Sequence, residues 1–462
     1  MTHFNPVSES ILQQLTAVVG ATNLSTAQSE RNLHAQDMSH HPARLSEVVV
    51  WPTTAQQVAD VLRIANEHGA PVTPWGAGSS LEGNPIPLYG GISLSLARMS
   101  DIIEVHQDDF QVTVQPGLGY KDLNEKLRRF GLFFPPDPGA NAWIGGMLAN
   151  NAAGSRTVKY GATKDNVLAM EVALADGRLI RVGSRSIKQA AGYDLLHLFI
   201  GSEGTLGVIT EATLKLTPVP TVMSGVKVTF DSVETAVEAV VAVRGSGLDI
   251  AALELVGAKM AELITRGGDD DWGDQPLLLM EIHTTHEEAA ELDLTLVQEI
   301  CEELGAINFQ ATTDPAVRKK MWQARHHMFE TQVRMFPGYQ WQLMDIAVPI
   351  SAYPELIAHA TQILQEYDTH GLMVGHAGDG NLHVSIPYKD EATWQSALII
   401  NDSVVYKAIE LGGTSTGEHG VGIGKAKYMQ REHGPGLEVM RLLKQTLDPN
   451  GILNPGKIFV AE

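Results

Sequence analysis

Residues 144–155 read IGGMLANNAAGS, a stretch that combines three glycines with two consecutive asparagines. Glycine has no Cβ, so its backbone reaches conformations that other residues avoid and can approach a ligand closely. Further glycine turns lie on either side in the chain: WGAGSS at 75–80, PDPG at 136–139, KYG at 159–161 and GSEGTLGVI at 201–209. If these turns converge, their backbone N–H groups and small hydroxyls suit a long diphosphate ligand. Tight turns in a β-rich domain are the alternative explanation, and composition alone does not decide between them.

Two familiar nucleotide-binding patterns do not fit these glycines. Residues 76–81, GAGSSL, lack the third glycine of the dinucleotide fingerprint at its required spacing. Residues 420–425, GVGIGK, resemble a phosphate-binding loop, but the first glycine is misplaced and Ala426 stands where a Ser or Thr would hold magnesium. The sequence therefore excludes both standard sites.

Hydrophobic periodicity divides the rest of the chain. Thr53 or Thr54 caps a predicted helix that Gly69 ends, with Val58, Val61, Leu62 and Ala65 on one face. Between 71 and 220, short runs typical of strands alternate with the glycine turns: 92–96, 102–105, 112–114, 167–174, 179–182 and 208–216.

The second half has fewer glycines. Beyond Pro218 and Pro220, we expect strands at 226–230 and 277–282 and helices at 232–243 and 286–304, and a late helix at 438–447. This pattern predicts a second α+β domain with helices on one face of a sheet. We therefore expect three parts: 1–220, 221–410 and 411–462.

Composition limits the function. The chain has 462 residues, and 33 Lys and Arg against 54 Asp and Glu give a net charge of −21, which argues against nucleic acid as a partner. Its one cysteine, Cys301, excludes a disulfide framework and an iron–sulfur cluster. The first ten residues lack a basic and apolar signal pattern, and no run approaches the ~18 apolar residues of a spanning helix. We expect a cytoplasmic protein, at most peripheral to a membrane.

Histidines gather in GHAGDGNLH, residues 375–383. His376 and His383 are seven apart, an odd offset that places them on opposite faces of a regular strand, but the glycine turn between them could return both to one point. GEHG at 417–420 adds the carboxylate of Glu418 and the imidazole of His419, which should differ in role. Two imidazoles and a carboxylate suit a divalent metal, zinc first and manganese or iron next. Histidines with purely structural partners are the alternative.

Residues 45–220 resemble the FAD-binding domain of the vanillyl-alcohol-oxidase type. A strand, a P-x-G-x-G-S-S turn, D-P-G, I-G-G-x-x-A-N-N-A-x-G and G-S-E-G-T-L-G follow in that family's order. The resemblance implies that the first turn binds the pyrophosphate, that the next motifs line the flavin and its ribityl phosphate, and that the last contacts the adenine side. The implied contacts are Pro74, Trp75, Gly76, Ala77, Gly78, Ser79 and Ser80; Pro138 and Gly139; Gly145, Gly146, Asn150, Gly154, Ser155 and Gly161; and Gly207 and Ile209. Covalently flavinylated relatives carry a histidine in the first turn, which this chain lacks, so the resemblance implies non-covalent FAD.

Residues 220–460 resemble the C-terminal domain of FAD-linked 2-hydroxy-acid dehydrogenases. That group includes cytochrome-linked D-lactate dehydrogenases, glycolate oxidase flavin subunits and D-2-hydroxyglutarate dehydrogenases. By its pattern H-x-G-D-G-N-x-H with E-H-G, the resemblance implies that His376, His383 and Glu418 bind a divalent metal and that His419 is the general base. It further implies that Arg325 binds the substrate carboxylate and that Asn454, in the terminal D-P-x-x-x-L-N-P-G-K motif, lies near the flavin. The fold class that follows is α+β, an FAD-binding domain followed by a cap domain with an antiparallel sheet.

The predicted function is metal- and FAD-dependent oxidation of a D-2-hydroxy acid, first of all D-lactate, to the 2-oxo acid. The metal would polarise the hydroxyl, His419 would take its proton, and hydride would pass from C2 to flavin N5. Residues 340–349, QWQLMDIAVP, lack the lysine of the hydroxyglutarate enzymes, so an apolar wall of Leu343 and Met344 favours lactate or an aliphatic hydroxy acid.

Several alternatives stay open. A glycolate oxidase flavin subunit or a D-2-hydroxyglutarate dehydrogenase would share the chemistry. A zinc-dependent hydrolase would be colourless, and a non-catalytic flavin-binding subunit would be yellow but inert towards hydroxy acids. The electron acceptor could be cytochrome c, a quinone, another flavoprotein such as an electron-transfer flavoprotein, or oxygen. The sequence also leaves a homodimer open.

Overall fold

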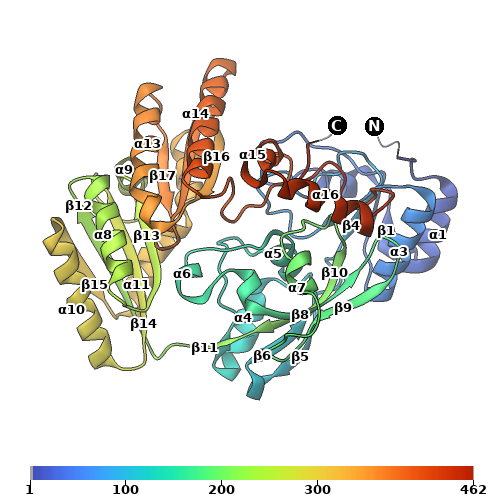
Figure 1. Cartoon of the computed structure of the whole chain (residues 1–462), viewed down its shortest axis with the longest axis horizontal. Coiled ribbons are helices and arrows are strands. Elements are labelled where there is room, and N and C mark those ends of the chain that lie inside the picture. Colours follow the sequence, from blue (N-terminus) through green and yellow to red (C-terminus); the bar gives the residue numbers. More distant parts are fainter. Residues whose placement is uncertain (1–3, 461–462) are drawn as a thin grey trace. The chain divides into compact units, whose positions relative to one another are not determined.

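The computed structural model describes residues 4–460 (Figure 1). Within them the chain forms two compact units. Unit 1 comprises residues 4–153, 161–219 and 418–460, and unit 2 comprises residues 154–160 and 220–417. The chain thus enters unit 2 twice, once as a seven-residue excursion and once as a long continuous segment.

Unit 1 contains a mixed sheet and an antiparallel sheet. The first has the strand order β1-β2-β4-β3, with β4 parallel to both β2 and β3. The second has the order β5-β6-β10-β8-β9, and β7 and β11 form a short pair. The strands are β1 (Leu24–Ser25), β2 (Val48–Val50), β3 (Val72–Trp75), β4 (Ile92–Ser95), β5 (Ile102–His106), β6 (Gln111–Val114), β7 (Leu132–Phe133), β8 (Val167–Ala173), β9 (Leu179–Gly183), β10 (Val208–Lys215) and β11 (Thr217–Pro218). Each strand predicted between residues 71 and 220 is therefore present.

The helices of unit 1 bury apolar faces against these sheets. In one core, Val58, Leu62 and Ala65 pack with Ile11 and Leu15 over the first sheet. A second core gathers side chains from the antiparallel sheet and from the helices beside it. The helices are α1 (Glu9–Val19), α2 (Gln28–Leu33), α3 (Ala55–His68), α4 (Tyr120–Leu127), α5 (Ile144–Asn150), α7 (Leu195–Phe199), α15 (Met429–His433) and α16 (Gly436–Leu447).

The ends of α3 are set by residues that the sequence identifies. Thr54 is the N-cap, and its side chain accepts a hydrogen bond from the Gln57 backbone N–H at 3.2 Å. Gly69 ends the helix in the left-handed conformation. Thr53, the other predicted cap, instead donates its hydroxyl to the Gln57 side chain at 3.0 Å. The structure therefore assigns the cap to Thr54.

Thr54→Ala should lower the free energy of unfolding by about 1 kcal/mol, because one backbone N–H of the first turn loses its partner. Thr53→Ala is the matched control, and we expect a change within about 0.5 kcal/mol because that contact is exposed. Urea denaturation followed by circular dichroism measures both. Equal losses for the two variants would contradict the assignment.

Unit 2 is built on one seven-stranded antiparallel sheet with the order β15-β12-β14-β13-β17-β18-β16. The strands are β12 (Val222–Phe230), β13 (Ile250–Val256), β14 (Leu277–Thr284), β15 (Ala306–Thr312), β16 (Gln340–Ala347), β17 (Leu372–Gly375) and β18 (Asn381–Tyr388). The helices are α6 (Thr157–Tyr160), α8 (Val233–Gly245), α9 (Ala258–Gly267), α10 (Glu287–Glu303), α11 (Pro315–His326), α12 (Met328–Met335), α13 (Tyr353–Glu366) and α14 (Glu391–Glu410). The expected antiparallel sheet is confirmed.

Helices cover both faces of this sheet, so the expectation of helices on one face is wrong. Every residue of β13 is buried, which requires cover on both sides. On one face, Ala252 and Val256 pack with residues of α9, α11 and α12 in a core that includes Met260, Trp322 and Met328. The intervening residues of β13 face the other way, and α8 contacts β12, β13 and β14.

Among residues 4–460, no helix is both long and apolar enough to span a bilayer.

Candidate functional site

The predicted FAD turns begin in unit 1 at the end of β3. Pro74 and Trp75 are the last residues of that strand, and residues 76–80 form the bend that follows. A Cβ added to Gly76 would lie 3.9 Å from the Cα of Gly146, in the first turn of α5, and would meet nothing nearer. A Cβ on Gly146 would meet nothing within 4 Å. Two backbones 70 residues apart therefore lie side by side with open space before them, which suits the close approach of a diphosphate.

Other predicted FAD glycines have an explanation in internal packing. A Cβ on Gly145 would lie 2.6 Å from Pro116, and one on Gly207 would lie 2.5 Å from Val172. Gly161 has a φ of +77°, and a Cβ there would lie 2.6 Å from Asp165. Ile209 is 7% exposed and belongs to the core of the antiparallel sheet. The ligand contacts of these four residues stay predictions, and packing within unit 1 by itself already requires the three glycines.

The other predicted FAD residues lie in loops and short helices. Gly139 has a φ of +78°, with nothing within 4 Å of an added Cβ, and follows Pro138 in an irregular segment. Ser80 hydrogen-bonds Asn84, and Asn150 is the last residue of α5. Gly154 donates its N–H to the Thr157 hydroxyl at 3.1 Å. Gly154 and Ser155 are the first two residues of the short segment 154–160 that belongs to unit 2.

Asn454 forms a buried junction in unit 1. Its amide donates to the backbone oxygens of Asn84 at 3.0 Å and Glu203 at 2.7 Å, and its side-chain oxygen accepts from Lys457 at 3.2 Å. The burial of Lys457 lowers the pKa of that ammonium to about 8, and Glu203 and Asp37 oppose the shift. Asn454 therefore joins the C-terminal segment to the loop that follows the first glycine turn and to the GSEGTLG turn.

A short turn brings the two histidines of GHAGDGNLH together. His376 follows β17, and a 3-10 turn at Ala377–Asp379 ends at Gly380, which has a φ of +71°. A Cβ on Gly380 would lie 2.1 Å from the backbone oxygen of Val348, so only glycine fits there. His383 then occurs in β18 and pairs with Val374 of β17. The turn therefore overcomes the odd spacing, and the two rings lie edge to face with centroids 5.2 Å apart.

Glu418 directly follows a segment that is anchored to the sheet of unit 2. Thr414 pairs with Ala347 of β16, and Thr416 donates its hydroxyl to Asp345 at 3.0 Å. A Cβ on Gly417 would lie 2.3 Å from the Asn381 amide, so this glycine is needed for the close packing. Glu418 is thus presented beside the strand that carries His383.

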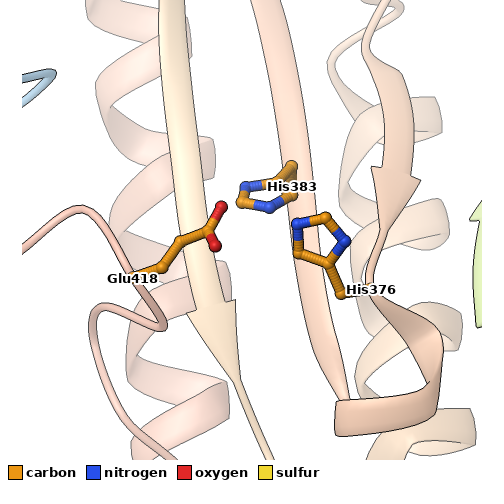
Figure 2. Close-up of side chains that lie close together, drawn as sticks. All are labelled: His376, His383 and Glu418. Carbon is orange, nitrogen blue, oxygen red and sulfur yellow. The ribbon is translucent and has the colours of Figure 1, made fainter. Parts of the chain in front are cut away.

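The three predicted metal ligands lie together (Figure 2). The ligand atoms of His376, His383 and Glu418 all lie within 4.8 Å of one another. His376 is buried, and the other two are half-buried. Two imidazole nitrogens and one carboxylate oxygen match the donor set of a catalytic zinc site, which keeps one position open. The residues present therefore fit a divalent ion.

A buried carboxylate forms a hydrogen bond with one residue of this cluster. Glu254 of β13 is fully buried and accepts a hydrogen bond from His376 Nδ1 at 2.7 Å. The same carboxylate forms an ion pair with Arg325 of α11, with Nη2–Oε2 at 2.6 Å and Nε–Oε2 at 2.8 Å. Burial raises the pKa of Glu254, but the charges and hydrogen bonds of His376 and Arg325 outweigh it and lower this pKa to about 2. Arg325, predicted to bind a substrate carboxylate, thus already contacts one carboxylate of the chain.

His419 lies beside the cluster without being one of its three members. Its Nε2 is 3.8 Å from Glu418 Oε1, and its backbone oxygen accepts a hydrogen bond from the Asn150 amide at 3.2 Å. Glu203 fixes the next residues, because its carboxylate accepts from the backbone N–H of Val421 at 2.6 Å and of Gly422 at 2.9 Å. Burial raises the pKa of Glu203, against the hydrogen bonds to these amides.

Three supporting carboxylates were not identified from the sequence: Glu254, Asp345 and Glu203. Glu254 and Asp345 each stand alone in an apolar strand, AALELV and WQLMDIAV, and both are fully buried. A single acidic residue in an otherwise apolar run was the available signal, because a buried carboxylate requires a partner. Asp345 accepts from the Asn381 amide at 2.8 Å and lies 3.8 Å from His383 Nδ1.

Leu343 and Met344, which were predicted to form one apolar wall, point to opposite faces of the sheet. Leu343 alternates with Asp345 along β16 and therefore shares its face of the sheet. Met344 is 1% exposed and points to the opposite face. Leu343 alone of the pair is placed on the side of Asp345.

Comparison with known families assigns both halves of the chain. Residues 46–183 match the model described as "FAD binding domain", and residues 219–458 match "FAD linked oxidases, C-terminal domain". The second match spans more than half of the chain.

Curated relatives match almost the whole length. A "Probable D-lactate dehydrogenase, mitochondrial" of Danio rerio is 37% identical over 98% of this chain and 92% of its own length. A "D-lactate dehydrogenase [cytochrome], mitochondrial" of Arabidopsis thaliana is 36% identical over 99% and 81%. The "Glycolate oxidase subunit GlcD" of Bacillus subtilis is 33% identical over 99% and 98%.

A solved structure of 4-ethylphenol oxidase from Gulosibacter chungangensis superposes with a TM-score of 0.80 at 18% identity, covering 98% of this chain and 97% of that one. This likeness confirms the predicted vanillyl-alcohol-oxidase-type fold. With the family models matched over both halves and relatives above 30% identity over nearly their full length, the chain belongs to the FAD-linked oxidases.

Proposed function

We propose that this flavoenzyme oxidises a D-2-hydroxy acid, with D-lactate as the first candidate, at a centre formed by His376, His383, Glu418 and His419. The observation that carries the proposal is the convergence of three ligand atoms within 4.8 Å in a chain whose relatives include D-lactate dehydrogenases. When bound, FAD would supply a two-electron acceptor, and a divalent ion would polarise the substrate hydroxyl.

The residues would divide the work by their chemistry. His376, His383 and Glu418 would hold the ion, and the substrate's carboxylate and hydroxyl would complete its coordination. His419 would accept the hydroxyl proton, as an imidazole does near neutral pH. The acid would lose this proton and a hydride from C2, and the product would be the 2-oxo acid.

Arg325 would contribute a second positive charge for the substrate carboxylate. Its guanidinium gives two N–H groups to one oxygen of Glu254, and an arginine has five such groups in all. The remaining donors suit a carboxylate. This assignment rests on the resemblance and on the place of Arg325 beside Glu254.

Anaerobic mixing of the FAD-loaded protein with D-lactate should bleach the flavin absorbance, and L-lactate should bleach it much more slowly. A panel of D- and L-2-hydroxy acids, followed by stopped-flow spectroscopy, gives the substrate class directly. A yellow protein that none of these acids reduces would contradict the proposal and favour a non-catalytic flavin subunit. A colourless protein that hydrolyses esters would favour a zinc hydrolase.

A glycolate oxidase flavin subunit is the second candidate, because the Bacillus subtilis GlcD subunit matches over 98% of its own length. Such a subunit would need partners for turnover. Full steady-state activity of the purified chain with an artificial acceptor would favour the dehydrogenase. We further propose a cytochrome as acceptor, on the support of relatives named for one.

A further inference from the structure

The sheet of unit 2 carries two buried carboxylates on one face, and each pairs with one histidine and with an arginine of the same helix. Glu254 lies on β13 with Ala252 and Val256, and Glu281 lies on β14 with Leu277 and Leu279. The four apolar residues belong to the core formed with α9, α11 and α12, so both carboxylates face that side.

Helix α11 supplies an arginine to each carboxylate. Arg318 and Arg325 are seven residues apart, which places them on one side of the helix. Arg325 contacts Glu254 at 2.6 Å, and Arg318 lies 3.9 Å from Glu281. Each carboxylate also accepts from an imidazole at 2.7 Å, Glu254 from His376 and Glu281 from His283. Glu281 has a second and nearer arginine, Arg156, at 3.1 Å. The two groups thus share a buried carboxylate, a histidine and an arginine of α11, but only His376 belongs to the predicted metal cluster.

The hydrogen bond to Glu254 determines which nitrogen of His376 is available to a ligand. An ionised carboxylate only accepts, so the proton of the neutral ring lies on Nδ1 and the lone pair lies on Nε2. Figure 2 shows one ring nitrogen of His376 facing His383 and the other pointing away. A metal-binding histidine with a carboxylate on its second nitrogen is fixed in rotation and is a more basic ligand.

We propose that Glu254 is a positioning residue of the metal centre, which holds His376 with Nε2 towards the ion and is itself held by Arg325. The inference rests on the proposed metal site. It adds a second task for Arg325, because its two contacts with one oxygen of Glu254 hold that carboxylate in place. Glu254 does not touch the substrate, so its loss acts through the affinity for the ion.

Glu254→Gln tests this with a matched control, Glu281→Gln. Both variants replace a buried carboxylate that pairs with an arginine of α11 and with a histidine, but only one of these histidines is a predicted ligand. FAD-loaded proteins stripped with a chelator are titrated with Mn²⁺ and with Zn²⁺ by calorimetry. We expect Glu254→Gln to weaken binding about 10- to 100-fold and Glu281→Gln to leave it within about threefold. The flavin content should stay equal in both.

Equal affinities in Glu254→Gln and in the unchanged protein, or equal losses in the two variants, would overturn the inference. An unchanged protein that binds neither ion would overturn it together with the proposed metal site. Normal metal binding with the expected loss in Glu254→Gln, but no oxidation of any hydroxy acid, would refute the proposed function and uphold Glu254.

A measurement on the unchanged sequence covers the case in which Glu254→Gln does not fold. In metal-free protein labelled with ¹⁵N-histidine, the resonance that disappears in His376→Gln should show a protonated Nδ1 and an unprotonated Nε2. A proton on Nε2 would overturn the inference.

Discussion

His383→Ala should lower turnover of a D-2-hydroxy acid by at least about 100-fold, because the proposed ion, by polarising the hydroxyl, would supply several kcal/mol to the reaction. The half-buried ring of His383 is one of three ligand donors, and a site with two donors holds a divalent ion weakly. Inductively coupled plasma mass spectrometry measures the metal content, and the rate of flavin reduction under anaerobic conditions measures the chemical step.

His359→Ala is the matched control for this experiment. His359 is a half-buried histidine of the same unit, on α13, and hydrogen-bonds the Ser403 hydroxyl at 3.0 Å. We expect normal metal content and turnover in this variant. Removal of the ion by a chelator should reproduce the effect of His383→Ala, and added Mn²⁺ or Zn²⁺ should reverse it. Full turnover after chelation would show that the reaction does not use the ion.

His419→Asn should slow flavin reduction by about 10²- to 10⁴-fold, the range that a general base contributes. Asn150 donates a hydrogen bond to the backbone oxygen of His419, and Glu203 accepts from the backbone N–H groups of Val421 and Gly422. The substitution should therefore leave the loop in place. Metal content and flavin content should therefore match the unchanged protein. Stopped-flow measurement of the reductive half-reaction isolates the step in which the proton leaves.

The pH dependence of the flavin-reduction rate distinguishes the loss of a general base from a disturbance of the loop that carries it. With the imidazole removed, the rate of flavin reduction should rise with hydroxide concentration and lose the plateau that a titrating base produces. His433→Asn, in α15 of the same C-terminal segment, should keep both the rate and the plateau. Normal flavin reduction in His419→Asn would show that His419 is not the general base.

Much of the fold could be predicted because it depends on short-range rules. Thr54, the apolar face of α3 and Gly69 set a helix within sixteen residues, and each strand predicted before residue 220 is present. The prediction that helices cover one face of the unit 2 sheet was wrong, because a short continuous apolar run such as β13 cannot be told from a buried helical segment by periodicity alone. Two of the helices that cover this strand, α11 and α12, lie far along the chain, beyond β14 and β15.

The amino-acid sequence by itself was enough to predict the glycine turns and the family that they resemble. It also identified His376, His383 and Glu418 as candidate ligands. These predictions depend on short motifs, whose residue types and spacing reflect the local backbone conformation. Only the tertiary structure determined which residue hydrogen-bonds to the ligand His376. Glu254 meets a histidine 122 residues away and an arginine 71 residues away. A lone carboxylate in an apolar strand must find a partner when it is buried, but which partner it finds depends on how distant strands and helices pack.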